Sequence, residues 1–208
     1  MARGEPGAVP TTRLETFADG VFAIAATLLV LNIELPAGGG SLGQGLAHLW
    51  PAYIAYAVSF LTIGIMWVNH HAILHLVAQT DRAFLFVNVL FLLVVAFLPF
   101  PTRVLADHLR SGDARAAALL YGVASLLMAT GFNAVWQYVL RGGLLAADAD
   151  PLVVSGISRS FRPGIPLYLG ATLLAFASPW ASAAMYALLA LFYVVPNGRF
   201  GRRDGAGA

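Results

Sequence analysis

Charged and imidazole side chains lie beside long apolar stretches of this chain, where a charge is costly unless it has a partner or a task. Arg13 and Asp19 precede the first uncharged apolar run, and His70 and His71 follow the second, with His75 one helical turn further on. A carboxylate and imidazoles at similar depth in a membrane could relay protons. A histidine pair spaced by four residues also suits a metal ion or a haem iron.

The sequence lacks the common motifs of enzymes and metal sites. It has no cysteine, and no third histidine or carboxylate lies at a usual ligand spacing from the histidine pair. It contains no H-E-x-x-H, G-x-S-x-G or P-loop motif and no pair of intramembrane aspartates. The net charge of +2 is too small and too scattered to indicate a nucleic acid partner. We therefore expect a protein that is not an enzyme and that holds no metal ion and no cofactor.

The elements that must position these side chains are membrane-spanning helices. Of the 208 residues, 59% are hydrophobic and only 11% are charged, which is too little charge to cover a soluble domain. A spanning helix needs about 20 mostly apolar residues. We therefore predict an all-α membrane protein with six transmembrane helices: Phe17–Leu35, Trp50–Val68, Ala83–Leu105, Arg115–Leu140, Pro163–Pro179 and Ala181–Val195.

The distribution of arginine predicts the orientation of these helices. Six spans place both termini on one side of the membrane. If that side is cytoplasmic, nine of the twelve basic residues lie inside, and only Arg103, Arg110 and Arg115 lie outside, as the positive-inside rule requires. We predict a multi-pass protein of the cell membrane with a cytoplasmic N-terminal segment 1–12, one membrane domain 13–197 and a disordered cytoplasmic tail 198–208.

The first helix has two different faces. At 100° per residue, Ile24, Leu28 and Leu31 form one stripe with Thr27 at its edge, whereas Asp19 points well away from it. The stripe fits contact with lipid or with another helix. It also fits the lining of a symmetric pore, in which rings of apolar side chains gate by excluding water and a threonine hydroxyl coordinates a cation. The periodicity does not choose between these alternatives.

The charges at the entrance of the first helix need partners outside that helix. Arg13 and Asp19 are six residues apart and so do not form an intrahelical pair. The interpretation that we favour is that they lock the helix to its neighbours, and a proton relay from Asp19 to His70 and His71 remains an alternative.

Polar and proline residues in the later spans lead to further expectations. Asn88 lies in an apolar run and needs a hydrogen-bond partner in the bundle. Pro99 and Pro101 are expected to end the third helix at the outer interface. Pro179 and Trp180 are expected to form the turn of a tight hairpin between the last two spans.

The first helix resembles the signature helix of the transmembrane protein 175 family of endosomal and lysosomal potassium channels and their prokaryotic relatives. The family pattern R-x-x-x-F-S-D corresponds to Arg13, Phe17, Ala18 and Asp19, with alanine in place of the serine. The resemblance extends to further positions in the second and third spans: Trp67, Asn69, His70, His71, Asn88 and the Leu98-Pro-Phe-Pro-Thr segment.

This resemblance implies a six-helix protomer that assembles as a homotetramer around a central potassium-permeable pore lined by the first helix. It implies that Ile24 forms a hydrophobic constriction, that Thr27 contributes to cation selectivity, and that Leu28 and Leu31 face the pore. In the family, the motif residues corresponding to Arg13, Phe17 and Asp19 anchor the first helix through the tryptophan and histidine group. Ala18 cannot supply the hydroxyl of the family's serine.

We therefore expect a passive potassium-permeable cation channel whose partners are copies of itself, potassium ions and the lipid bilayer. Neither the family nor this sequence has the T-V-G-Y-G filter of ordinary potassium channels. The alternatives are a proton leak or proton-coupled transporter that uses Asp19 with His70 and His71, a metal or haem protein that uses His71 and His75, and a membrane subunit without activity of its own.

Overall fold

The computed structural model describes residues 11–35 and 41–194. These residues form helices and connecting turns, with an isolated β-bridge between Val77 and Leu145. Residues 11 and 12 begin the first helix, and the rest of the predicted segment 1–12 lies outside the described residues, as does the whole predicted tail 198–208. The prediction of an all-α protein is confirmed.

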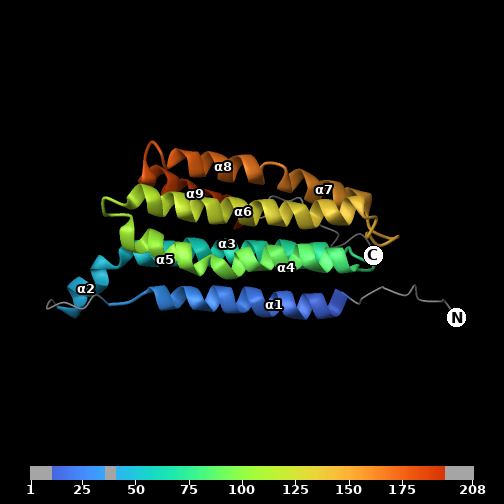
Figure 1. Cartoon of the computed structure of the whole chain (residues 1–208), viewed down its shortest axis with the longest axis horizontal. Coiled ribbons are helices and arrows are strands. Elements are labelled where there is room, and N and C mark those ends of the chain that lie inside the picture. The colour runs from blue at the N-terminus through green and yellow to red at the C-terminus, as the bar shows by residue number, and fades with distance from the viewer. Residues whose placement is uncertain (1–10, 36–40, 195–208) are drawn as a thin grey trace, which may run out of the picture.

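The helices follow one another along the chain with short connections. Figure 1 shows α1, α3, α4, α6, α8 and α9 running side by side along the long axis of the molecule. The elements are α1 (Thr11–Leu28), the 3₁₀-helix η1 (Leu29–Asn32), α2 (Leu42–His48), α3 (Trp50–Leu74), α4 (Arg82–Phe97), α5 (Pro99–His108), α6 (Ala114–Arg141), α7 (Pro151–Phe161), α8 (Gly164–Leu174) and α9 (Pro179–Val194).

Four helical segments are long and apolar enough to cross a membrane, and they correspond to the first four predicted spans: Thr11–Asn32, Trp50–Leu74, Arg82–His108 and Ala114–Arg141. The predicted fifth span contains α8, with 11 residues, and the predicted sixth span overlaps most of α9, with 16 residues. Both are apolar and lie alongside the long helices (Figure 1), but they are shorter than the usual span of about 20 residues. Six spans therefore stay a prediction for these two helices.

Two predictions about proline are wrong. Pro99 and Pro101 do not end the third span, because α5 begins at Pro99 and continues to His108. Proline is tolerated in the first turn of a helix, where its missing N–H has no helical acceptor, so the prolines divide the span without stopping it. Pro179 likewise begins α9, and the hairpin turn lies just before it, at residues 175–178.

Polar caps fix where α4 begins and how it meets α6. Asp81 precedes α4, and its carboxylate accepts a hydrogen bond of 2.7 Å from the backbone N–H of Phe84. The hydroxyl of Tyr138, near the end of α6, donates to the same carboxylate at 2.9 Å. One side chain therefore caps one helix and joins it to another.

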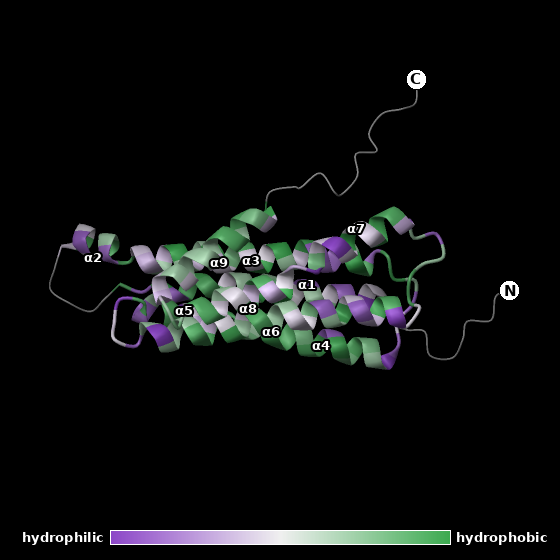
Figure 2. Cartoon of the chain, turned by 90° about the horizontal axis from the view of Figure 1, so that it is seen from above, coloured by the Kyte–Doolittle hydropathy of each residue, from purple (hydrophilic) through white to green (hydrophobic). Residues whose placement is uncertain are grey.

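Hydrophobic residues extend along the length of the helices, and many of the hydrophilic residues lie toward their ends (Figure 2). Helix α6 contributes much of the core, with Tyr121, Met128 and Trp136 buried along it. Large apolar side chains on α4 and α9, among them Leu90, Leu93 and Leu191, are exposed. An apolar outer surface of this kind suits contact with lipid tails.

A small residue permits the close approach of α6 to α8 and α9. A β-carbon at Gly122 would lie 2.7 Å from atoms of both Thr172 and Tyr186. These two side chains share a hydrogen bond of 2.8 Å, so they cannot move apart without breaking it. Glycine at this position is therefore a packing requirement.

We predict that Gly122→Ala lowers the stability of the purified protein by about 1–3 kcal/mol, because an added methyl group must displace the Thr172–Tyr186 pair. The measurement is the midpoint of thermal unfolding in detergent. Gly170→Ala is the control, since a β-carbon at Gly170 in α8 meets no atom within 4 Å. Equal midpoints for the two variants would contradict the packing argument.

Candidate functional site

Helix α1 buries one face and exposes the other. The buried face packs against α3 and α4, and its members are Leu14, Ala18, Phe22, Ala25 and Leu29. Small residues at a helix interface let two backbones approach closely. Ala18, which takes the place of the serine in the family pattern, lies within this packed face.

The predicted stripe lies on the opposite, exposed face. Ile24 is 60% exposed, Leu28 is 42% exposed and Leu31 is 63% exposed. Phe17 is also exposed, two turns earlier on the same side. A single chain therefore leaves a continuous apolar stripe without cover on α1, available to lipid, to a pore or to another copy.

The last turn of this segment tightens and changes the alignment of the stripe. Leu29–Asn32 form a 3₁₀-helix, which has 3.0 residues per turn. Side chains three residues apart eclipse one another in a 3₁₀-helix, whereas they are offset in an α-helix. Leu31 is therefore aligned more closely above Leu28 than the regular helical periodicity predicts.

Thr27 lies beside the apolar stripe with its proton already engaged. Its hydroxyl donates to the carbonyl oxygens of Ala23 at 2.9 Å and Ile24 at 3.0 Å. A hydroxyl that donates inward keeps its lone pairs for the exposed side. The hydroxyl oxygen can therefore coordinate a cation at that surface.

A hydrogen bond fastens the first half of α1 to α3. The indole Nε1–H of Trp67 donates to the Oδ1 atom of Asp19 at 2.8 Å. Asp19 lies on the flank of α1, away from the apolar stripe, as the sequence predicts. This contact, the Asp19–Trp67 clasp, joins α1 to α3 and so restrains the rotation of one helix relative to the other.

A buried polar pair lies deeper in the same region. Nε2 of His70 lies 2.9 Å from Oδ1 of Asn88, and Nδ2 of Asn88 donates to the carbonyl of Phe84 at 2.8 Å. His70 is 2% exposed and Asn88 is fully buried. The predicted need of Asn88 for a partner is met by His70, which joins α3 to α4.

Aromatic packing connects this pair to α1. The ring of Phe22 lies 5.6 Å from that of His70 and 6.0 Å from that of Phe91, and His70 stacks on Phe91 at 5.6 Å. Helices α1, α3 and α4 therefore meet in one cluster. Aromatic contacts at these distances add to the stabilisation that comes from burial alone.

The structure does not bring every predicted anchoring residue into this network. Asn69 donates to the carbonyl of Ile65 in its own helix at 2.8 Å. Arg13 is exposed and forms no ion pair within residues 11–35 and 41–194. Asp19 and His70 share no direct hydrogen bond within the same ranges, so a proton relay between them would need an intervening group.

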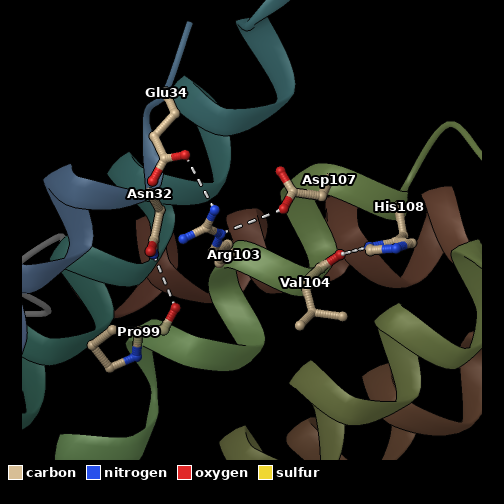
Figure 3. Close-up of polar contacts among 7 residues, drawn as sticks. All are labelled: Asn32, Glu34, Pro99, Arg103, Val104, Asp107 and His108. Carbon is tan, nitrogen blue, oxygen red and sulfur yellow. Dashed lines mark hydrogen bonds and ion pairs between the residues drawn. The ribbon is translucent and has the colours of Figure 1, made fainter. Parts of the chain in front are cut away.

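A second set of contacts, which was not predicted from the sequence, holds η1 and the residues that follow it. Nδ2 of Asn32 donates to the carbonyl oxygen of Pro99 at 2.9 Å. The guanidinium of Arg103 lies between two carboxylates, 3.2 Å from Glu34 and 3.6 Å from Asp107 (Figure 3). We call Asn32, Glu34, Pro99, Arg103 and Asp107 the outer contacts.

The ion pairs of the outer contacts are exposed and contribute little to stability, typically about 0–1 kcal/mol each. The Arg103–Glu34 pair has a positional consequence, because it joins the segment directly after η1 to α5, whereas the Arg103–Asp107 pair lies within α5. Two features of the sequence point to the outer contacts. Asn32 and Glu34 directly follow the first apolar run, and Pro99 and Pro101 lack the N–H donors that a continuous third span would have.

A large cavity lies on the flank of α1 that carries Asp19. Its volume is about 910 Å³, and its walls come from α1, α3, α6, α7, α8 and α9. The lining is mostly apolar, and Asp19 is the charged side chain in it. No group of three or more histidine, cysteine or acidic residues that could hold a metal ion occurs in the described part of the chain.

Comparison with known proteins shows extensive similarity. Residues 13–99 match the sequence model of the family described as endosomal/lysosomal potassium channel TMEM175. A potassium channel of Chamaesiphon minutus is 44% identical over 190 residues, which cover 89% of this chain and 94% of that protein. A potassium channel of Streptomyces collinus is 46% identical over 191 residues, covering 87% of this chain and 90% of that protein.

The human endosomal/lysosomal proton channel TMEM175 is 39% identical over 97 residues, which cover 42% of this chain and 19% of that protein. Among solved structures, the crystal structure of a lysosomal potassium-selective channel TMEM175 homolog from Chamaesiphon minutus matches with a TM-score of 0.79. That match is 42% identical and covers 88% of this chain and 96% of the other.

We predict that Asn88→Ala destabilises the protein by about 1–3 kcal/mol, because the buried His70 imidazole loses its partner. The control is Asn133→Ala, since the amide of Asn133 in α6 donates only to the carbonyl of Ala129 in its own helix, at 2.9 Å. Thermal unfolding of both variants in detergent measures the difference. A midpoint for Asn88→Ala as high as that of Asn133→Ala would refute a joining role for the His70–Asn88 pair.

Proposed function

Because the chain belongs to the TMEM175 family of ion channels, we propose that it conducts potassium ions passively across a membrane through a pore lined by α1. The observation that carries this proposal is the exposed apolar stripe of α1, with a threonine at its edge, on a helix that other contacts hold in place. Bacterial relatives that are 44% and 46% identical are named potassium channels.

The proposed assembly is a homotetramer. A protomer has one α1, and one helix cannot enclose a path. Four copies around a central axis would turn Ile24, Leu28 and Leu31 into three stacked apolar rings, and they would cover the stripe that a single chain leaves exposed. We also propose that both termini are cytoplasmic, on the basis of the arginine distribution.

The proposed gate is hydrophobic. A narrow ring of Ile24 side chains excludes water, and an ion that crosses it would lose its hydration shell. Widening of the ring lets water enter, so the barrier falls without any charged group moving. The hydroxyl oxygens of Thr27, next to the stripe, would coordinate the cation in place of some of its water molecules and so lower the cost of dehydration.

The proposed selectivity for potassium over sodium is modest. The sequence contains no T-V-G-Y-G segment, so no ring of carbonyl oxygens of that kind replaces the hydration shell. The hydroxyl oxygens of Thr27 and the backbone dipoles of α1 would then discriminate between the two ions.

A second candidate is proton conduction, and one observation favours it: the vertebrate relatives are named proton channels. Asp19, His70 and His71 are the titratable groups that a relay would use. Trp67 engages one oxygen of Asp19, and Asn88 engages His70, so this candidate requires water to connect them.

We expect Ile24→Asn to raise the single-channel current of protein in planar bilayers several-fold, because a polar ring stays wet. A fall of about 1.4 kcal/mol in the barrier corresponds to about tenfold more current. Leu93→Asn is the matched control, because Leu93 in α4 is 65% exposed but does not lie on α1. If both variants behave as the wild type does, α1 does not line the pore.

We expect Thr27→Val to reduce the preference for potassium, since valine keeps the shape of the side chain and removes its oxygen. The reversal potential under a potassium/sodium bi-ionic gradient measures this, and the variant should lie closer to zero than the wild type. A wild-type current that follows only a pH gradient would reject the potassium proposal in favour of proton conduction, and Asp19→Asn should then abolish it.

A further inference from the structure

The end of α3 carries a histidine pair that the proposed ion path does not use. Nε2 of His71 and Nε2 of His75 lie 2.9 Å apart. The two rings are perpendicular, with centroids 4.3 Å apart, and both residues are exposed. Two ligand-type nitrogens therefore converge on one point of the surface.

The helix holds these nitrogens together. His71 lies in the last turn of α3 and His75 directly follows it with helical backbone angles, φ −62° and ψ −22°. Residues four apart in a helix lie on the same face, so both imidazoles leave the helix in one direction. Little side-chain motion is needed to aim both nitrogens at a shared ion.

The spacing of the two nitrogens, a hydrogen-bond distance in the free protein, is also close to the separation that one coordination geometry requires. With metal–nitrogen bonds of about 2.0–2.1 Å, two ligands at a right angle lie roughly 2.9 Å apart, whereas two ligands of a tetrahedron lie roughly 3.3 Å apart. The observed 2.9 Å fits the right angle. Square-planar and tetragonal sites with nitrogen ligands are typical of Cu²⁺ and Ni²⁺, and Cu²⁺ binds such ligands most tightly of the divalent first-row ions.

We propose that His71 and His75 form a two-nitrogen site for a divalent transition metal ion, with Cu²⁺ preferred, in which water fills the remaining positions. In the free protein the Nε2–H of one imidazole donates a hydrogen bond to Nε2 of the other. In the bound state both Nε2 lone pairs point at the ion, and the proton of each ring resides on Nδ1. Binding therefore exchanges one hydrogen bond for two metal bonds.

The site is connected to the anchor of α1. The ring of His71 stacks on that of Trp67, with centroids 6.1 Å apart and an angle of 24° between the planes. Trp67 in turn holds Asp19 through the Asp19–Trp67 clasp. A metal ion that fixes His71 restrains Trp67, so bound Cu²⁺ holds the first half of α1 in place and lowers the current; this consequence rests on the proposed function.

The test of binding is titration of tag-free, full-length protein in detergent with Cu²⁺, followed by electron paramagnetic resonance. We expect a tetragonal Cu²⁺ signal with hyperfine splitting from two nitrogens. His71→Asn and His75→Asn should each weaken binding by at least about tenfold, the lower limit for loss of even an outer-shell partner. His48→Asn, which removes a histidine from α2, should bind as the wild type does. Equal affinity in all three variants would overturn the site.

The test of the effect on current is separate from the test of binding. In planar bilayers, Cu²⁺ at the side of His71 should lower the wild-type current and leave the His75→Asn current unchanged. Equal inhibition of both would overturn the connection to the clasp. A wild type that binds Cu²⁺ with two nitrogens but conducts nothing would contradict the proposed function while the metal site stands.

Discussion

Hydrogen bonds hold the segment formed by α1 and η1 at two places, one before Ile24 and one after Leu31, and apolar and aromatic side chains pack the stretch between them against its neighbours. The Asp19–Trp67 clasp fastens the first half to α3, and the amide of Asn32 fastens the far end to the carbonyl of Pro99. Hydrogen bonds fix direction as well as distance, whereas apolar packing permits sliding and small rotations. The two contacts therefore set the depth and rotation at which Ile24 and Thr27 are presented.

The buried polar pair His70–Asn88 also helps to hold α1 in its position. His70 and Asn88 would each be costly without a partner in an apolar surrounding, and together they satisfy one another. Phe22 packs on the His70 ring, so the pair also supports the buried face of α1. A change in the position of α1 must disturb either this cluster or the contacts at its two ends, which makes the resting position well defined.

The interruption of the third span by proline has a structural use. Pro99 and Pro101 divide the span into α4 and α5, and the carbonyl of Pro99 at the break accepts the hydrogen bond from Asn32. Proline was expected to end the helix because it lacks an N–H and clashes with the preceding turn. A new helix can begin at such a residue, however, and α5 carries Arg103 to the position where it meets Glu34. The break thus creates the outer contacts.

The sequence by itself determined the helical class, the first four spans and the two faces of α1, because helical periodicity and hydrocarbon length are local properties of the chain. The resemblance of its motifs to the family pointed to Asp19, Trp67, His70 and Asn88 as residues that anchor the first helix. Only the tertiary structure decided that Asp19 bonds to Trp67 and His70 to Asn88, and that Arg103 meets Glu34. The residues in these pairs are 18 to 69 positions apart in the sequence. Whether they meet depends on the rotation and the depth of each helix against its neighbours. A local sequence pattern encodes neither of these.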